Sequence, residues 1–233
     1  MNRSVQGVVL LLLGGTLGRL GLSGTYLRYV KPSLLPWLLL TSALLVVLGA
    51  WALVDELRSH GDGSADEDSQ PHTHNSPRIA WLLLLPVMAV FVIAPPALGA
   101  FAAERTPAVV TPPASAAPAL PAGDPVVVAL NDYAARAVWD AGQSLVNRNV
   151  EMTGFVTPSG TGWDLTRLTL TCCAADAIPT RIKPLGVTAL PADTWVTVIG
   201  HWVPGGGLNS ESAIPWIQVT SIVRIAAPKN PYE

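Results

Sequence analysis

Trp163–Asp176 reads WDLTRLTLTCCAAD, a strand-like run that leads into the only two cysteines of the chain. Apolar and polar residues alternate from Trp163 to Cys173, with Leu165, Leu168 and Leu170 among the apolar positions. A spacing of about two residues is typical of a β-strand with one buried face. The segment therefore predicts a strand whose end carries two adjacent thiols, within a small domain of β-strands.

The strand-like pattern recurs throughout residues 126–233, and glycines mark turns and bends among the runs. The other runs are Val126–Val128, Asn149–Thr157, Ile178–Lys183, Thr194–Val203 and Ile214–Ile225. Asn131 or Asp132 is suited to cap a helix that continues through Trp139, because short polar side chains accept hydrogen bonds from the first helical turn. Short strands with one helix favour a mainly-β C-terminal domain shaped as an OB-like barrel, with a small sandwich as the alternative.

The adjacency of Cys172 and Cys173 restricts their chemistry. Consecutive Cα atoms lie about 3.8 Å apart, whereas an unstrained disulfide needs about 4.4–6.8 Å. In an extended strand the two thiols also point to opposite faces. The unstrained states are a reduced pair with one thiol buried, a soft metal ion shared with Asp176 and further ligands, or a disulfide to another protein. The simplest interpretation is that one cysteine is a small buried apolar residue.

The N-terminal part of the chain is too apolar for an ordinary soluble domain. Of the whole chain, 50% is hydrophobic and only 13% charged, and the mean hydropathy is +0.41. The apolar runs span about 5–22, 34–54 and 79–101. Their lengths approach the ~20 residues that cross a bilayer, and Trp37 and Trp51 lie near the ends of the second run, where interfacial aromatic residues occur. The sequence predicts a membrane region over residues 1–104 with about three transmembrane helices in a lipid bilayer.

Two further stretches lie between these segments. Residues 55–78 are rich in acidic residues, Gly and Ser and carry His60, His72 and His74, so we expect a loop without a fixed fold. Imidazole and carboxylate ligands suit zinc and its neighbours, which makes the loop a candidate for weak metal capture, with a solvated hydrophilic loop as the alternative. Residues 105–125 are rich in Pro and Ala, and they predict an extended linker without a core.

With these pieces placed, the chain resembles the YcgQ-type family of bacterial membrane proteins, which are described as permease subunits. The matching segments are the apolar hairpin with its His/Asp-rich loop, Leu130–Tyr133, Val150–Val156, Thr166–Arg167, Thr171–Ala177 and the end of the chain from Pro228 to Tyr232. The CC-x-A-D motif and the KNPY sequence are the specific parts of this resemblance, which covers nearly the whole chain.

The resemblance implies a multi-spanning permease-like membrane protein as partner and a link to metal homeostasis. It carries over Cys172, Cys173 and Asp176 as candidate site residues and implies no catalytic mechanism. The histidines of this chain are sparser than the His/Asp runs of some family members, which weakens the metal role of the loop.

Together these observations predict an accessory subunit of a two-component permease, linked to transport or homeostasis of a transition metal such as zinc. Cys172, Cys173 and Asp176 would hold zinc or another soft or borderline ion, because thiolates select such ions. No enzyme is expected, since adjacent thiols lack the CxxC spacing of a redox pair. The sequence also has no nucleophile–base pattern and no phosphate loop.

The alternative is a membrane-anchored OB-like module that binds a non-nucleic-acid ligand or a partner protein without metal. Its possible ligand face is made of Trp163, Trp195, Trp202 and Trp216, for which packing in the core and rim is the commoner role. Nucleic acid is not expected as a partner, because the net charge is −2 and the charges of the β domain are balanced.

The predicted location is the cell membrane, with several passes. Lys and Arg are evenly divided between the two sides, so the count of positive charges does not orient the spans. The Pro/Ala-rich linker favours an extracytoplasmic C-terminal domain, since such stalks are common on exported domains.

Overall fold

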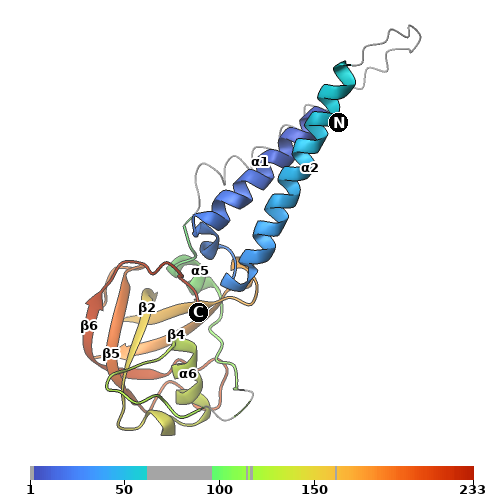
Figure 1. The fold of residues 1–233 in the computed structure, drawn as a ribbon. Helices are drawn as coiled ribbons and strands as arrows, with labels where there is room; N and C mark the ends of the chain where they lie inside the picture. The colour runs from blue at the N-terminus through green and yellow to red at the C-terminus, as the bar shows by residue number, and fades with distance from the viewer. Residues whose placement is uncertain (1–2, 62–95, 114, 116–117, 161) are drawn as a thin grey trace. The chain divides into compact units, whose positions relative to one another are not determined.

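The computed structural model describes residues 3–61, 96–113, 115, 118–160 and 162–233, and the chain divides into two units (Figure 1). The first unit contains two long helices. The second unit comprises Leu27–Lys31, which we call the connector, together with Ala97–Glu233. The connector lies between the two helices in the chain, yet it belongs to the unit that contains the β-strands.

The first unit is a helical hairpin of α1 (Arg3–Leu22) and α2 (Leu35–Gly61), with the short 3-10 turns Thr25–Arg28 and Pro32–Leu34 between them. Small residues line the contact. The Ser42 hydroxyl donates to the Gly14 carbonyl at 2.8 Å, and a methyl group on Gly49 would come within 2.9 Å of the Gly7 carbonyl oxygen. Small residues at such contacts let helix backbones approach closely, as they do in membrane helix pairs.

The outer faces of this hairpin are apolar. Trp37, Leu40 and Trp51 are 67%, 60% and 70% exposed, and in the two candidate spans, Val5–Ser23 and Pro32–Arg58, only 17% and 11% of the residues are buried. Both helices are long and apolar enough to cross a membrane, by length and composition. The first two predicted spans therefore correspond to helices, and their exposed apolar surface fits a lipid environment.

The second helix extends further than the predicted span. Residues 55–61 were expected to begin the loop, but they continue α2 to Gly61 because Glu56, Leu57 and Arg58 are good helix formers. His60 thus lies in the last turn of α2, whereas His72 and His74 lie outside the described residues.

Most of the third predicted span, residues 79–95, also lies outside the described residues. By its contacts, Ala97 onward groups with the second unit, and the membrane region predicted to residue 104 stays a prediction. A short helix, α5 (Ala100–Arg105), begins after Gly99. Ala100 is only 2% exposed and donates its N–H to the Asp193 carboxylate at 2.6 Å, which fixes α5 to the β domain.

The second unit is built on one six-stranded sheet with a helix beside it (Figure 1). Its strands are β1 (Val126–Val127), β2 (Asn149–Ser159), β3 (Gly162–Thr169), β4 (Ile178–Leu185), β5 (Trp195–Val203) and β6 (Trp216–Arg224), and its longer helix is α6 (Leu130–Trp139). β2 pairs antiparallel with both β3 and β5, while β4 pairs antiparallel with β3 and parallel with β6. Because β6 also pairs with β5, and β5 pairs with β2, the series of strand pairings that starts at β2 leads back to β2.

Alternate residues of the strands build the main core, as the period of two predicts. Residues on one face pack together with α6: Val150, Met152, Val156, Trp163, Leu165, Ile182, Val196, Val198, Ile217, Leu130 and Tyr133. Tyr133 is fully buried, and its hydroxyl donates to the Trp216 carbonyl at 2.7 Å, which ties α6 to β6.

The Pro/Ala-rich linker does not stand free of this domain. Val110 is 3% exposed and packs with Ala134, Val138 and Ala213, and its N–H donates to the Glu211 carbonyl at 2.8 Å. Further along, the Pro118 carbonyl accepts a hydrogen bond from Arg136 at 2.9 Å. The expectation of a linker without a core was therefore wrong for these residues, because scattered apolar side chains and free carbonyls find partners on the domain.

Asp164 is a buried acid on the opposite face of β3, and it yields a pH prediction. It is 1% exposed, and burial raises the pKa of its carboxyl, an effect that Ser159, Lys183 and Arg181 partly offset. Because the pKa of Asp164 is higher in the folded than in the unfolded state, protonation of this carboxyl favours folding. That contribution to stability is fully present below about pH 4, and it is lost as the pH rises through the pKa of the folded state.

We therefore expect Asp164→Asn to raise the free energy of unfolding at pH 7 by on the order of 1 kcal/mol, because it removes a buried charge. Thermal unfolding of the wild type and the variant at pH 4 and pH 7 measures this. The wild type should lose stability relative to the variant between these values. A variant that is less stable than the wild type at pH 7 would show instead that the ionised carboxylate stabilises the fold.

Candidate functional site

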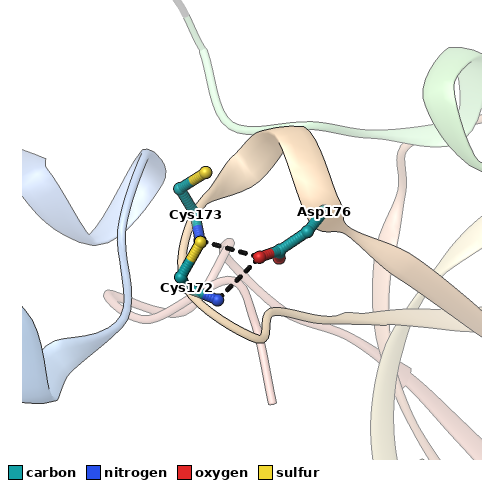
Figure 2. Close-up of side chains that lie close together, drawn as sticks. All are labelled: Cys172, Cys173 and Asp176. Carbon is teal, nitrogen blue, oxygen red and sulfur yellow. Dashed lines mark hydrogen bonds between the residues drawn. The ribbon is translucent and has the colours of Figure 1, made fainter.

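The two cysteines lie in a turn rather than in a strand. β3 ends at Thr169, and the chain then turns through the 3-10 helix η4 (Ala174–Asp176) before β4 begins (Figure 2). We call residues Thr171–Asp176 the cysteine loop. The prediction that the thiols end a strand was therefore wrong, and the turn removes the expectation that they face opposite sides. One donor atom each from Cys172, Cys173 and Asp176 lies within 4.8 Å of the others.

The Asp176 carboxylate organises this loop. It accepts the backbone N–H groups of Thr171 at 2.9 Å, Cys172 at 2.7 Å and Cys173 at 3.3 Å. The Cys172 thiol also hydrogen-bonds to it, and this contact, helped by the backbone N–H groups, lowers the pKa of Asp176 to about 2. The carboxylate is thus ionised at neutral pH and holds both cysteine backbones in place (Figure 2).

The same contacts affect the Cys172 thiol in the opposite direction. Its hydrogen bond to Asp176, and then its hydrogen bond to Cys173, raise the pKa of Cys172 to about 11. The protonated thiol predominates at neutral pH and is a weak nucleophile, because the thiolate is the reactive form. The arrangement therefore offers little to thiol redox chemistry.

A bound metal cation would change the protonation of Cys172, because the ion replaces the proton of the thiol. Cys172 is exposed, while Cys173 and Asp176 are half-buried, so the donor atoms are reachable from solvent. Two sulfur donors beside a carboxylate are a ligand set for soft or borderline ions such as zinc or copper(I). Three donors from the chain leave a position open on a four-coordinate ion, as in sites where an ion exchanges ligands.

The connector holds the cysteine loop from its other side. The Ala174 N–H donates to the Tyr29 carbonyl at 2.7 Å, and the Lys31 N–H donates to the Cys172 carbonyl at 3.2 Å. Val30 and Cys173 form an antiparallel β-bridge between these two bonds. The cysteine loop is therefore bonded both to Asp176 and to the connector, a partnership that the sequence does not predict.

The end of the chain supports the same region. Tyr232 is 3% exposed, and its hydroxyl donates to the Arg28 carbonyl at 2.9 Å and accepts the Leu98 N–H at 3.0 Å. The Glu233 carboxylate accepts the Leu130 and Asn131 N–H groups at 3.0 and 3.2 Å, and so caps α6 in place of the predicted Asn131 or Asp132 side chains. Burial raises the pKa of Glu233, and these N–H groups and Arg167 offset part of that shift.

Arg167 joins this C-terminal segment to the sheet. It is 8% exposed, its guanidinium donates to the Asn230 carbonyl at 3.0 Å, and it lies 4.9 Å from the centre of the Trp195 ring. The Thr166–Arg167 pair and the KNPY sequence were visible as motifs, but nothing in the sequence shows that they contact each other.

The four tryptophans of the predicted ligand face occupy different environments. Trp163 is 3% exposed within the main core, and Trp195 packs edge-on against Phe155 at 5.5 Å between ring centres. Trp202 is half-buried against the core, and Trp216, at 38%, is the most exposed. A ligand face at these residues stays a prediction, with Trp216 as its most accessible ring. His201 is exposed on β5, and it belongs to no group of three or more potential metal ligands in the described residues.

A cleft of about 490 Å³ lies on the surface of the second unit and reaches Thr171, the first residue of the cysteine loop. It is lined by Val109–Pro113, by residues from the first turns of α6, and by Thr169, Ile178 and Thr180. Hydroxyl groups, Asn131 and Asp132 supply its polar lining, and no Lys or Arg lines it. The cleft therefore suits a neutral or cationic ligand better than an anion.

Two family models match the chain. The model described as DUF1980 N-terminal domain matches residues 5–105, and the model described as DUF1980 C-terminal domain matches residues 126–233. No curated protein and no solved structure matches it. The first range contains the helical hairpin and α5, and the second contains all six strands and α6.

Proposed function

The chain belongs to the DUF1980 family, and from that membership we propose that it is a membrane-anchored accessory subunit of a transporter whose C-terminal domain presents a soft-metal site. The subunit would act with a multi-spanning permease-like membrane protein in transport or homeostasis of a zinc-like ion. The ion is the cargo, and Cys172, Cys173 and Asp176 are the residues that bind it. The role is one of binding and transfer, without catalysis.

One observation carries this proposal. The only two cysteines of the chain converge with a carboxylate on the surface of a domain that is attached to two apolar helices. A buried pair of small apolar residues has no need of this arrangement, and Cys172 is exposed. Ions near a membrane could be received at such a site and passed on through its open coordination position.

The proposal includes an OB-type barrel for the C-terminal domain. Its support is the order of pairings, in which β2, β3 and β4 form an antiparallel meander, β6 pairs parallel with β4, and β5 links β6 back to β2. This order is that of the five-stranded Greek-key barrel. The position of α6 before β2 differs from the usual place of the barrel helix, between the third and fourth strands.

We also propose a topology with three crossings. The connector joins two candidate spans and pairs with the cysteine loop, so the connector and the C-terminal domain belong on the same side of the membrane. The end of α2 then belongs on the other side, and the chain must cross once more before Ala97. The part of the apolar run predicted at 79–101 that precedes Ala97 would supply that crossing. We place the C-terminal domain outside the cytoplasm, where it would meet arriving ions first.

Thiol labelling of intact cells tests this topology, because Cys172 and Cys173 are the only native thiols. We expect a membrane-impermeant maleimide to label Cys172 in intact cells. In a variant without the native cysteines, Ser23→Cys, which lies beside the connector, should also be labelled in intact cells. Ser59→Cys, near the end of α2, should be labelled only after the cells are permeabilised. Labelling of Cys172 and Ser23→Cys from opposite sides would reject the three-crossing topology, whichever side faces the cytoplasm.

Metal binding by the full chain in detergent tests the metal site. We expect the reduced wild type to bind zinc or copper(I) with sub-micromolar Kd, measured by competition with a chromophoric chelator. Cys172→Ser/Cys173→Ser should weaken binding by about 100-fold or more, because two of the three donors are lost. His201→Ala is the matched control, since it removes an exposed imidazole elsewhere and should leave binding unchanged. Equal binding by the cysteine variant would remove the metal role from this site.

The second candidate function is a membrane-anchored OB-like module that binds a ligand without metal. The observation that favours it is the 490 Å³ cleft beside the cysteine loop, with its hydroxyl-rich lining. A small neutral hydroxylated molecule would find both hydrogen-bond donors and acceptors there. This function would gain support if the metal titration gave no cysteine-dependent binding.

A further inference from the structure

The connector and the cysteine loop are held together by backbone bonds that involve the cysteines themselves. The bonds run from Ala174 N–H to the Tyr29 carbonyl at 2.7 Å and from Lys31 N–H to the Cys172 carbonyl at 3.2 Å. A metal ion shared by the two thiols would orient the Cys172–Cys173 peptide and its neighbours. The polar groups that contact the connector belong to the same short stretch of backbone.

Asp176 and the connector divide the backbone groups of this stretch between them. Asp176 accepts the N–H groups of Cys172 and Cys173, while the connector bonds the Cys172 carbonyl and the Ala174 N–H. The backbone on either side of the thiols is therefore fixed by hydrogen bonds before any ion arrives. Holding ligands in place in advance lowers the entropy lost on binding.

The connector is also anchored at its other end. The Tyr232 hydroxyl donates to the Arg28 carbonyl at 2.9 Å, and Tyr232 itself is buried in a cluster with Phe155 and Leu168. The connector continues directly into the residues that lead to α1 and α2. The connector is part of the segment that joins α1 and α2, so any change in its pairing with the cysteine loop changes that segment directly.

We propose that metal occupancy of the cysteine loop and pairing of the connector are positively coupled, so that ion arrival in the β domain is communicated to the segment between α1 and α2. The inference rests on the proposed metal site and adds its regulation. By linkage, pairing strengthens metal binding by the same factor by which metal strengthens pairing. The connector is thus a positioning element for the site, and it supplies no ligand.

Ala174→Pro removes one connector bond and leaves every ligand in place. Proline lacks the N–H that reaches Tyr29, and it is well tolerated at the first position of a helical turn. The preceding Cys173 is extended, with φ −149° and ψ 172°, which suits the residue before a proline. We expect metal Kd to rise by about 10-fold in the full chain in detergent, within the range typical of coupled sites.

Two further variants make the result specific. Ala175→Gly loosens the loop without removing a connector bond and should bind metal as the wild type does. Tyr232→Phe removes the bond to Arg28 at the far end of the connector, touches no thiol, and should weaken binding in the same direction as Ala174→Pro.

Hydrogen exchange in the wild type provides a measurement that no substitution can disturb. Saturating zinc should slow exchange of the Lys31 and Ala174 amides by about the factor found for Kd. Cysteine-dependent zinc binding with no change at these amides, or with wild-type Kd in Ala174→Pro, would overturn the coupling and leave the metal site standing. Absence of cysteine-dependent binding in the wild type would overturn both.

Discussion

Arg167→Met is expected to lower the free energy of unfolding by about 3 kcal/mol, since it removes a buried charge that several groups depend on. The guanidinium donates to the Asn230 carbonyl, lies over the Trp195 ring and balances the buried Glu233 carboxylate. With a thioether in its place, the Asn230 carbonyl loses its donor, and Glu233 loses the positive charge that partly offsets its burial. The segment Asn230–Glu233 should then detach from the sheet.

Denaturant unfolding of the full chain in detergent measures the loss, and hydrogen exchange shows where it arises. The amides of Leu98, Leu130 and Asn131 donate to Tyr232 and Glu233, so they should lose protection first. Arg167→Lys is the control, because it keeps the charge without the planar fork, and we expect about half the loss. Full stability in Arg167→Met would mean that the C-terminal segment is held by its apolar contacts alone.

Gly206→Ala is expected to destabilise the domain by about 3–5 kcal/mol, the sum of a backbone penalty and a steric one. Gly206 has φ +80°, and a methyl group there would collide with the backbone carbonyl of Ile214. The loop cannot avoid this collision by turning a side chain, because the obstructing atom is main chain. Ile214 also donates its N–H to the Gly206 carbonyl at 3.0 Å, so both sides of the loop would have to separate.

Gly160→Ala separates the backbone penalty from the steric penalty. Gly160 has φ +52°, but a methyl group there meets nothing within 4 Å, so only the backbone penalty of about 1–2 kcal/mol applies. Thermal unfolding of the two variants under identical conditions gives the comparison. Equal losses for Gly160→Ala and Gly206→Ala would show that the loop before β6 yields to the added methyl group.

Periodicity predicts strands well in this chain because one face of each strand packs against a shared core. The period of two at Val150, Met152 and Val156 follows directly from that core. The end of β3 at Thr169 was missed for a physical reason. The next N–H groups bond to Asp176 rather than to a neighbouring strand, and composition alone does not reveal which acceptor an N–H will choose.

The candidate site could be predicted only in part from the sequence. Cys172, Cys173 and Asp176 were visible as a motif because cysteine is rare in this chain and the spacing is short. The connector and Tyr232 were not found as supports of the site, because they lie far from it in sequence. Arg167 lies close to the site in sequence, but the carbonyl that its side chain bonds belongs to Asn230, 63 residues away. Backbone carbonyls such as that of Tyr29 leave no signature in residue identity.

The return of the strand ladder to β2 has a consequence for how the domain forms. β2 is made before its partner β5, and a long stretch that includes β3, β4 and the cysteine loop must be synthesised between them. Until β5 arrives, β2 has an open edge able to pair with other chains. Such distant pairings make folding slow, so the newly made chain passes through an aggregation-prone interval. Once β5 closes the ladder, the open edge of β2 disappears, and further copies of the protein cannot recruit it.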